Sequence, residues 1–176
     1  MKSVAAIGLA ALLMGGCATQ GHDAGPRVVS APGPQQEAAF GQIKSLKGTW
    51  KMDHNAEGNG EIVFAVSSNG SIVREIMFPG TPSEMTNIYH LDGPSIVMTH
   101  YCAMGNQPRM RATGGTAKEI AFACDGVSNL TSADEMYMGE MTLTFKDKDH
   151  VTELWHHFDH GKKSDKPTKI ELTRAE

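Results

Sequence analysis

The change from a helical to a two-residue hydrophobic period near residue 47 constrains this chain more than any other feature. From there to the C-terminus, apolar and polar residues alternate in short stretches, a pattern typical of β-strands with one buried face. The preceding stretch, 37–46, has helical spacing and predicts one short helix. The expected strands are 48–53, 60–66, 71–78, 83–91, 94–102, 109–114, 118–124, 139–147, 149–158 and 167–174.

Short turns separate most of these strands, as at Ser68-Asn69-Gly70 and Asp92-Gly93-Pro94. Connections this short leave no room for crossover helices, so neighbouring strands are expected to be antiparallel. Only 127–138 predicts a longer loop, with a helical turn capped by Ser132 and Glu135. Ten such strands can form a sandwich or a barrel, and only the barrel removes its edge strands. We therefore expect an all-β protein, an antiparallel up-and-down β-barrel of about ten strands with a short N-terminal helix.

The first expected strand begins with Leu46-Lys47-Gly48-Thr49-Trp50. A short helix followed by Gly-x-Trp resembles the start of lipocalin and calycin barrels, whose small ten-stranded relatives include fatty-acid-binding proteins and nitrobindin-like haem barrels. The resemblance covers 37–176 and is architectural. It implies that Trp50 closes one end of the barrel against an arginine late in the chain, for which Arg174 is available. The segments 98–102 and 105–110 also resemble an uncharacterised bacterial family, which implies no activity.

The N-terminus predicts export and lipidation. Lys2 precedes an apolar stretch, 4–14, which is too short to span a bilayer and is followed by Gly15-Gly16-Cys17. These residues resemble the lipobox of bacterial lipoproteins, which implies removal of 1–16 as a signal peptide and acylation of Cys17 with palmitate or a similar chain. Ala18 after the cysteine implies an outer-membrane anchor facing the periplasm. Residues 18–36 are expected to be a tether and 37–176 the barrel domain; the alternative is an ordinary secretory signal with an incidental cysteine.

Charge and motifs exclude several function classes. The chain has 16 Lys and Arg against 20 Asp and Glu, so no basic excess is available for binding nucleic acid. Signatures of serine hydrolases, zinc proteases, phosphate-binding loops and dithiol oxidoreductases do not occur in the sequence. We therefore expect a protein that is not an enzyme and that meets the membrane through its lipid anchor.

Two further cysteines, Cys102 and Cys124, remain for an oxidising compartment. Each is expected to end a strand, and the two strands are separated by one other. Strands two apart lie about 9.5 Å from each other, whereas a disulfide needs Cα atoms within about 7 Å. A disulfide therefore requires the barrel to narrow there, and the alternative is two buried thiols.

Histidines are the conspicuous polar residues of the body. His156 and His160 lie about 13 Å apart on an extended strand, so the His-rich segment there cannot converge on a metal by itself. His100 shares a strand face with Ile96 and Met98. If that face points into the barrel, His100 is either a hydrogen-bonded core residue or a ligand. If a haem of the nitrobindin kind were bound, His100 and His157 would be the candidate axial ligands.

Four charged residues have alternative orientations that the sequence leaves open. Arg109 and Arg111 share one face of a strand. Facing inward, they would bind the carboxylate of a fatty acid through bidentate hydrogen bonds; facing outward, they would be surface charges. Glu75 and its neighbour Arg74 lie on opposite faces, so one of them is expected to enter the barrel or its wall.

Two functions fit these features. The barrel encloses a small apolar or amphipathic ligand of the fatty-acid or haem class, or it is filled by its own side chains and serves as a structural or interaction module of the cell envelope. The nine methionines between residues 52 and 141 suit an adaptable binding cavity and a plain core almost equally.

Overall fold

The computed structural model describes residues 30–53, 60–116 and 118–176. The expected signal peptide, Cys17 and most of the expected tether lie outside this range. One helix precedes the strands, α1 (Pro34–Ser45), and a 3₁₀ turn, Ser68–Gly70, joins β2 to β3. The strands are β1 (Gly48–Asp53), β2 (Glu61–Ser67), β3 (Ile72–Met77), β4 (Met85–Asp92), β5 (Ser95–Tyr101), β6 (Gln107–Thr116), β7 (Glu119–Ser128), β8 (Tyr137–Phe145), β9 (His150–Asp159), β10 (Lys162–Lys163) and β11 (Thr168–Arg174).

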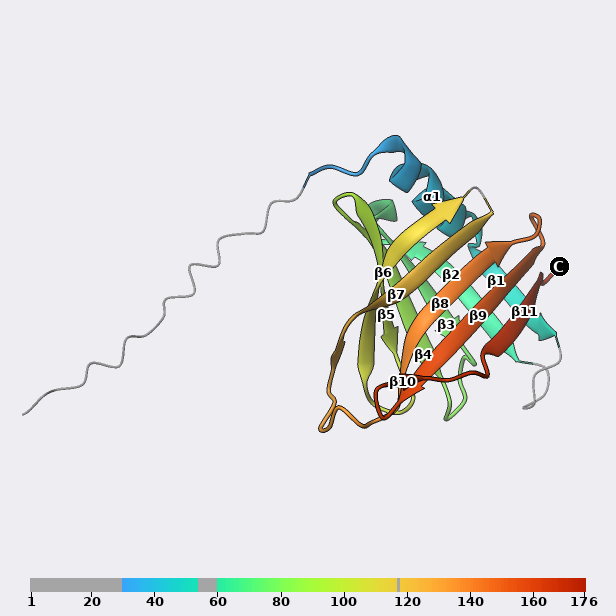
Figure 1. The fold of residues 1–176 in the computed structure, drawn as a ribbon. Coiled ribbons are helices and arrows are strands. Elements are labelled where there is room, and N and C mark those ends of the chain that lie inside the picture. Colours follow the sequence, from blue (N-terminus) through green and yellow to red (C-terminus); the bar gives the residue numbers. More distant parts are fainter. Residues whose placement is uncertain (1–29, 54–59, 117) are drawn as a thin grey trace, which may run out of the picture.

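Every neighbouring pair of strands is antiparallel, and the sheet closes on itself (Figure 1). From β1 to β9 each strand pairs with the next in the chain, and β8 pairs with β9 from Tyr137↔Phe158 to Phe145↔Val151. β11 then lies between β9 and β1, with Thr168 opposite Trp155 and Trp50 opposite Arg174. The two-residue β10 only extends the β9 turn. The expected antiparallel barrel of about ten strands is confirmed.

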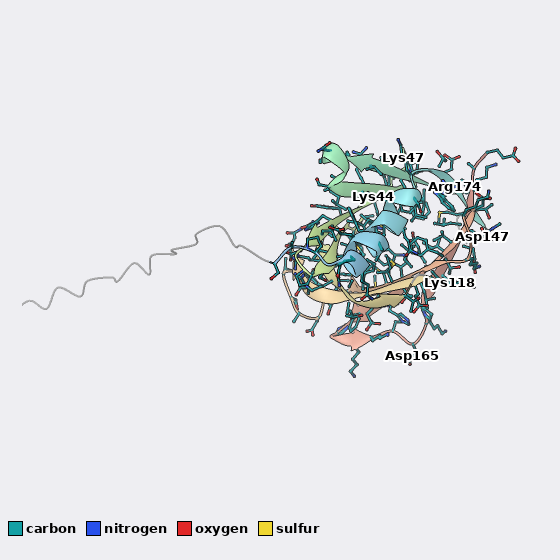
Figure 2. The ribbon with its side chains drawn as sticks, turned by 90° about the horizontal axis from the view of Figure 1, so that it is seen from above. Lys44, Lys47, Lys118, Asp147, Asp165 and Arg174 are labelled. Carbon is teal, nitrogen blue, oxygen red and sulfur yellow. The ribbon has the colours of Figure 1, made fainter. Side chains whose placement is uncertain are left out.

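Alternation along the strands sorts side chains between the inside and outside of the barrel. Ile62 and Phe64 on β2, Ile120 and Phe122 on β7, and other inward residues form one continuous core. The helix α1 lies across one end of the barrel (Figures 1 and 2) and packs Phe40 and Ile43 against that core. Within the described residues, no helix is both long and apolar enough to cross a membrane.

Several boundaries differ from those expected, and three of the differences change the helix or the long loop. The helix begins at Pro34, because proline suits the first helical position, so the last residues of the expected tether are helical. β7 continues to Ser128 and β8 begins at Tyr137, which shortens the loop to 129–136. The expected cap is present in that loop, since Glu135 accepts hydrogen bonds from the backbone N–H groups of Thr131 and Ser132, but it closes a turn rather than a helix.

Trp50 and Arg174 join the helix to the barrel. The indole of Trp50 is fully buried and donates a 2.7 Å hydrogen bond to the carbonyl of Leu46 at the end of α1. The guanidinium of Arg174 lies 4.2 Å from the centre of the Trp50 ring. It also donates to the carbonyls of Ser45, Lys47 and Lys148, at 3.1, 3.0 and 3.2 Å. The arginine thereby satisfies helix C-terminal carbonyls that have no partner inside the helix, at the end of α1 where Figure 2 shows Lys44, Lys47 and Arg174.

We expect Trp50→Ala to lower the free energy of unfolding by about 3–5 kcal/mol, because it truncates a buried aromatic side chain. Arg174→Lys should also lower the free energy of unfolding, because lysine cannot bond three separate carbonyls in fixed directions. The loss should be smaller than for Trp50→Ala, because lysine keeps the positive charge. Lys169→Ala, on the exposed face of β11, should stay within about 0.5 kcal/mol of the wild type. Urea unfolding measures the free energy of unfolding of all three variants. It is followed by tryptophan fluorescence for the Arg174 and Lys169 variants and by circular dichroism for the Trp50 variant. A Trp50→Ala cost below about 1 kcal/mol would contradict the expected role of this pair.

Candidate functional site

Six polar or aromatic side chains from four strands meet inside the barrel. We call them the buried polar ring: Glu75 on β3, Asn87 and Tyr89 on β4, His100 on β5, and Glu153 and Trp155 on β9. None is more than 2% exposed. They face inward because each shares the phase of buried apolar neighbours on its own strand, such as Met98 for His100. The alternative left open at residues 74 and 75 is thereby decided: Glu75 enters the barrel and Arg74 is exposed.

Short hydrogen bonds connect the ring. Glu75 Oε2 accepts from Asn87 Nδ2 at 2.8 Å and from the Tyr89 hydroxyl at 2.6 Å. The other end of the Asn87 amide, Oδ1, lies 2.7 Å from His100 Nδ1. On the opposite strand, Trp155 Nε1 donates to Glu153 Oε2 at 2.9 Å. The indole of Trp155 also packs against the His100 ring, with centroids 5.1 Å apart.

Burial shifts the protonation of the acids in this ring. Burial raises the pKa of Glu75, against the opposing effect of the hydrogen bonds from Tyr89, Asn87 and Glu153. The pKa of Glu153 lies well above its ordinary value, again first because of burial and then because of the negative charge of Glu75. Tyr89 follows the same pattern, so its hydroxyl stays protonated and donates. The ring therefore combines two acids whose charged forms are both disfavoured.

His100 is held as a neutral ring with a defined tautomer. Because Asn87 donates through its nitrogen to Glu75, its oxygen faces His100, and Nδ1 of the imidazole must carry the proton. The other nitrogen, Nε2, is buried and has no hydrogen-bond partner among the described residues. Burial lowers the pKa of His100 to about 4. The imidazole is therefore a neutral core group at physiological pH.

A haem does not fit around His100. The Nε2 atom could in principle ligate iron, but the side chain is closely enclosed and its ring lies against Trp155. The neighbouring inward residues Met98 and Met110 are fully buried, so a porphyrin would have to displace packed side chains. Among the described residues, no three His, Cys, Asp or Glu side chains are grouped so that they could hold a metal ion.

The other site residues expected from the sequence lie away from the ring or at its margin. His157 shares the inward phase of Glu153 and Trp155, one step nearer the barrel end opposite α1, and is half-buried. Arg109 and Arg111 alternate with the inward Pro108 and Met110, so both face outward. Arg111 Nη2 lies 2.7 Å and Arg109 Nη2 3.2 Å from Asp92 Oδ2, and both arginines also pair with Asp125. They are surface ion pairs and cannot bind a carboxylate inside the barrel.

The two cysteines are free thiols and are not placed for a disulfide. Cys124 lies opposite Met110, and Met110 lies opposite Met98. Cys102 follows Met98 by four residues, about 13 Å further along the strand direction. The sequence-based argument placed both cysteines at one barrel end because it ended β7 at Cys124, whereas the strand continues to Ser128.

A separate groove lies at the helix-covered end, with a volume of about 420 Å³. It is bordered by α1 on one side and by the upper ends of β5, β6 and β7 on the other. None of the described residues that line it carries a charge. The lining residues are Gln35, Gln36, Ala38, Ala39, Gln42, Pro94, Ser95, Ile96, Ala112, Thr113, Gly114, Gly115, Thr116 and Ile120.

The strand β6 gives this groove polar backbone as well as small side chains. β5 pairs with β6 only between Arg109 and Arg111, whereas β7 pairs with β6 as far as Thr116. Residues 112–116 therefore pair on one side only, and Ser95 Oγ reaches the carbonyl of Ala112 at 3.5 Å. The groove thus offers apolar surface, amide side chains and a strand edge, which are features of sites for neutral amphipathic molecules.

Sequence reasoning identified His100 but missed Asn87, Tyr89, Glu153 and the groove. For Glu153 a signal existed, because it lies between Val151 and Trp155 on the inward phase of β9. An acid in the inward phase of a strand is a candidate for an interior site. The groove had no such signal, since its lining comes from small residues at the ends of separate elements.

The pKa of His100 gives a testable pH dependence. Because the folded pKa of about 4 lies below the ordinary 6.5, the folded state binds fewer protons than the unfolded state between these values. The stability contribution is therefore lost as the pH falls through this window, by about 2 kcal/mol at pH 5. In urea unfolding at pH 7 and 5, His100→Gln should remove this loss, whereas the outward His156→Gln should retain it. Equal pH dependence in wild type and His100→Gln would contradict the assignment.

Comparison with known proteins adds no functional information. No protein-family model matches the chain, and no curated protein matches it at a significant level. A function for this chain therefore has to be inferred from its own barrel, ring and groove.

Proposed function

We propose that this chain is a lipid-anchored, periplasmic β-barrel protein that binds a small, uncharged amphipathic molecule in the groove between α1 and β5–β7. The groove carries this proposal. Its volume of about 420 Å³ lies within the range of ordinary small-molecule sites. Its lining is mostly apolar or small, with amides and hydroxyls to orient a polar head group.

The absence of charge in the lining narrows the ligand class. A fatty-acid carboxylate placed there would lose hydration without gaining an ion-pair partner, which is unfavourable. The two arginines that could have neutralised it face outward and are already paired with Asp92 and Asp125. A neutral head group, such as the glycerol of a monoacylglycerol, suits the glutamines and the edge of β6 better.

A second candidate function is the structural module of the cell envelope. It is favoured by the packing of the barrel interior, where Trp50, Phe64, Tyr89 and Phe122 are fully or almost fully buried. A ligand inside the barrel would compete with these side chains. The groove lies outside this packed interior, so the two candidate functions make different predictions for it.

The groove is tested with the uncharged fluorophore N-phenyl-1-naphthylamine. We expect the wild type to enhance its fluorescence, and monoolein to displace it at lower concentration than oleate. Ala112→Phe should weaken binding at least about tenfold, a change of about 1.4 kcal/mol, because Ala112 lines the groove and shares the inward phase of Phe122 opposite it, so that the added ring would occupy the groove.

Gly41→Phe is the matched control for this substitution. It adds a ring on α1, where a Cβ meets no atom within 4 Å, and Gly41 does not line the groove. This variant should bind the fluorophore like the wild type. If neither wild type nor Gly41→Phe enhances fluorescence, or if Ala112→Phe binds normally, the structural module is favoured instead.

The lipid anchor requires a separate test. Cells that express the full chain should incorporate radioactive palmitate into the wild type and into Cys102→Ser, but not into Cys17→Ser. The reason is that only Cys17 follows the lipobox-like residues 13–16, and the attached chains give stable membrane binding. Label retained by Cys17→Ser would contradict the anchor without affecting the groove.

A further inference from the structure

The carboxyl groups of Glu75 and Glu153 are each left with one oxygen that accepts nothing. In both residues Oε2 is occupied, by Asn87 and Tyr89 in one case and by Trp155 in the other. In both residues Oε1 is buried and has no donor among the described residues. A continuous set of contacts joins the two residues across the barrel, from Glu75 through Asn87, His100 and Trp155 to Glu153, and each carboxyl group shifts the pKa of the other. Two carboxylates cannot form a hydrogen bond with each other, because neither has a hydrogen to donate.

The surroundings of the pair contain no charge that could replace a proton. The titratable groups that face it are Tyr89 from β4, His100 from β5, and the two acids themselves from β3 and β9. Tyr89 and His100 are both neutral at physiological pH, for the reasons given above. No lysine or arginine of the described chain contributes to the charge around either acid. Two negative charges in this enclosed space would repel each other strongly.

We propose that Glu75 and Glu153 form a proton-binding site inside the barrel, in which one proton is held between the two carboxyl groups and links β3 to β9. The proton resides on Glu153 Oε1 and is donated to Glu75 Oε1. Glu75 is the better anion because it also accepts from Asn87 and Tyr89, whereas Glu153 accepts only from Trp155. The ligand of this site is the proton itself, and the site is independent of the groove.

The proton links barrel stability to pH. The direction is opposite to that of an acid whose pKa is lowered on folding, because here stability falls as the pH rises. Both carboxyl groups have a pKa in the folded state above the unfolded value, so the folded chain holds a proton that the unfolded chain releases. The stabilisation is complete below the unfolded pKa, near 4.5, and is lost as the pH rises through the folded pKa. The window of interest lies above pH 7.5, about one unit above the ordinary histidine pKa of 6.5, where His100 is deprotonated in both states and adds little pH dependence.

Glu153→Gln tests the site because glutamine imitates the protonated acid. Its amide nitrogen can donate to Glu75 and its oxygen can accept from Trp155. Between pH 7.5 and 9, we expect the unfolding equilibrium constant of the wild type to increase by up to about tenfold per pH unit, the slope for one proton. The constant for Glu153→Gln should change much less. Glu119→Gln makes the same substitution at an exposed acid on β7, outside the pair, and should retain the wild-type slope.

An infrared measurement on the folded protein tests the proposal without relying on unfolding. In D₂O at pH 7, the wild type and Glu119→Gln should show the carbonyl stretching band of a protonated carboxylic acid, and Glu153→Gln should lack it. A wild type without this band at pH 7 would overturn the proposal. Parallel pH dependence of wild type and Glu153→Gln would do the same. Neither outcome depends on whether the groove binds a ligand.

Discussion

The hydrogen-bond ladder between β8 and β9 is the constraint on which the rest of this structure depends. It runs from Tyr137↔Phe158 to Phe145↔Val151 and converts an open antiparallel sheet into a closed barrel. Closure gives every strand an inside and an outside, so a single phase error would reverse a whole set of side chains. It also brings β9 across the interior from β3, which lets Glu153 approach Glu75 although the residues are far apart in sequence. The buried polar ring exists only because the sheet is closed.

The fold was accessible from the sequence because its two determinants are local. Alternation in stretches such as 60–66 and short turns such as Asp92-Gly93-Pro94 specify antiparallel hairpins without reference to distant residues. The pair of Trp50 and Arg174 was also accessible, through the Gly48-Thr49-Trp50 motif and the phase of the last strand. Strand ends were less accessible, since the extension of β7 to Ser128 depends on pairing with β6 rather than on its own residues. That error carried over to the expected proximity of Cys102 and Cys124.

The candidate sites were accessible only in part, because they depend on partners from other elements. His100 could be placed on an inward face by its own strand, but its neutral state follows from Asn87 and from burial. The orientation of Arg109 and Arg111 could not be chosen from two equivalent phases. The outward phase is accompanied by a register shift near Met110 and by ion pairs with Asp92 and Asp125 on neighbouring strands. These features exist only in the folded barrel. The buried polar ring thus lies inside the barrel, whereas the groove lies at the end of the barrel that α1 covers.

The one-sided pairing of β6 has a consequence for how the chain avoids self-association. Beyond Arg111, β6 continues to Thr116 without β5 beside it, so a short strand edge remains in an otherwise closed sheet. Such an edge can template pairing with a second chain. The helix α1 lies over this end of the barrel (Figure 1), and its residues Gln35, Gln36 and Gln42 line the same groove as residues 112–116 of β6. Besides covering the core, the helix therefore lies beside residues 112–116 of β6, which pair on one side only, and its proteolytic removal would expose this edge to pairing with a second chain.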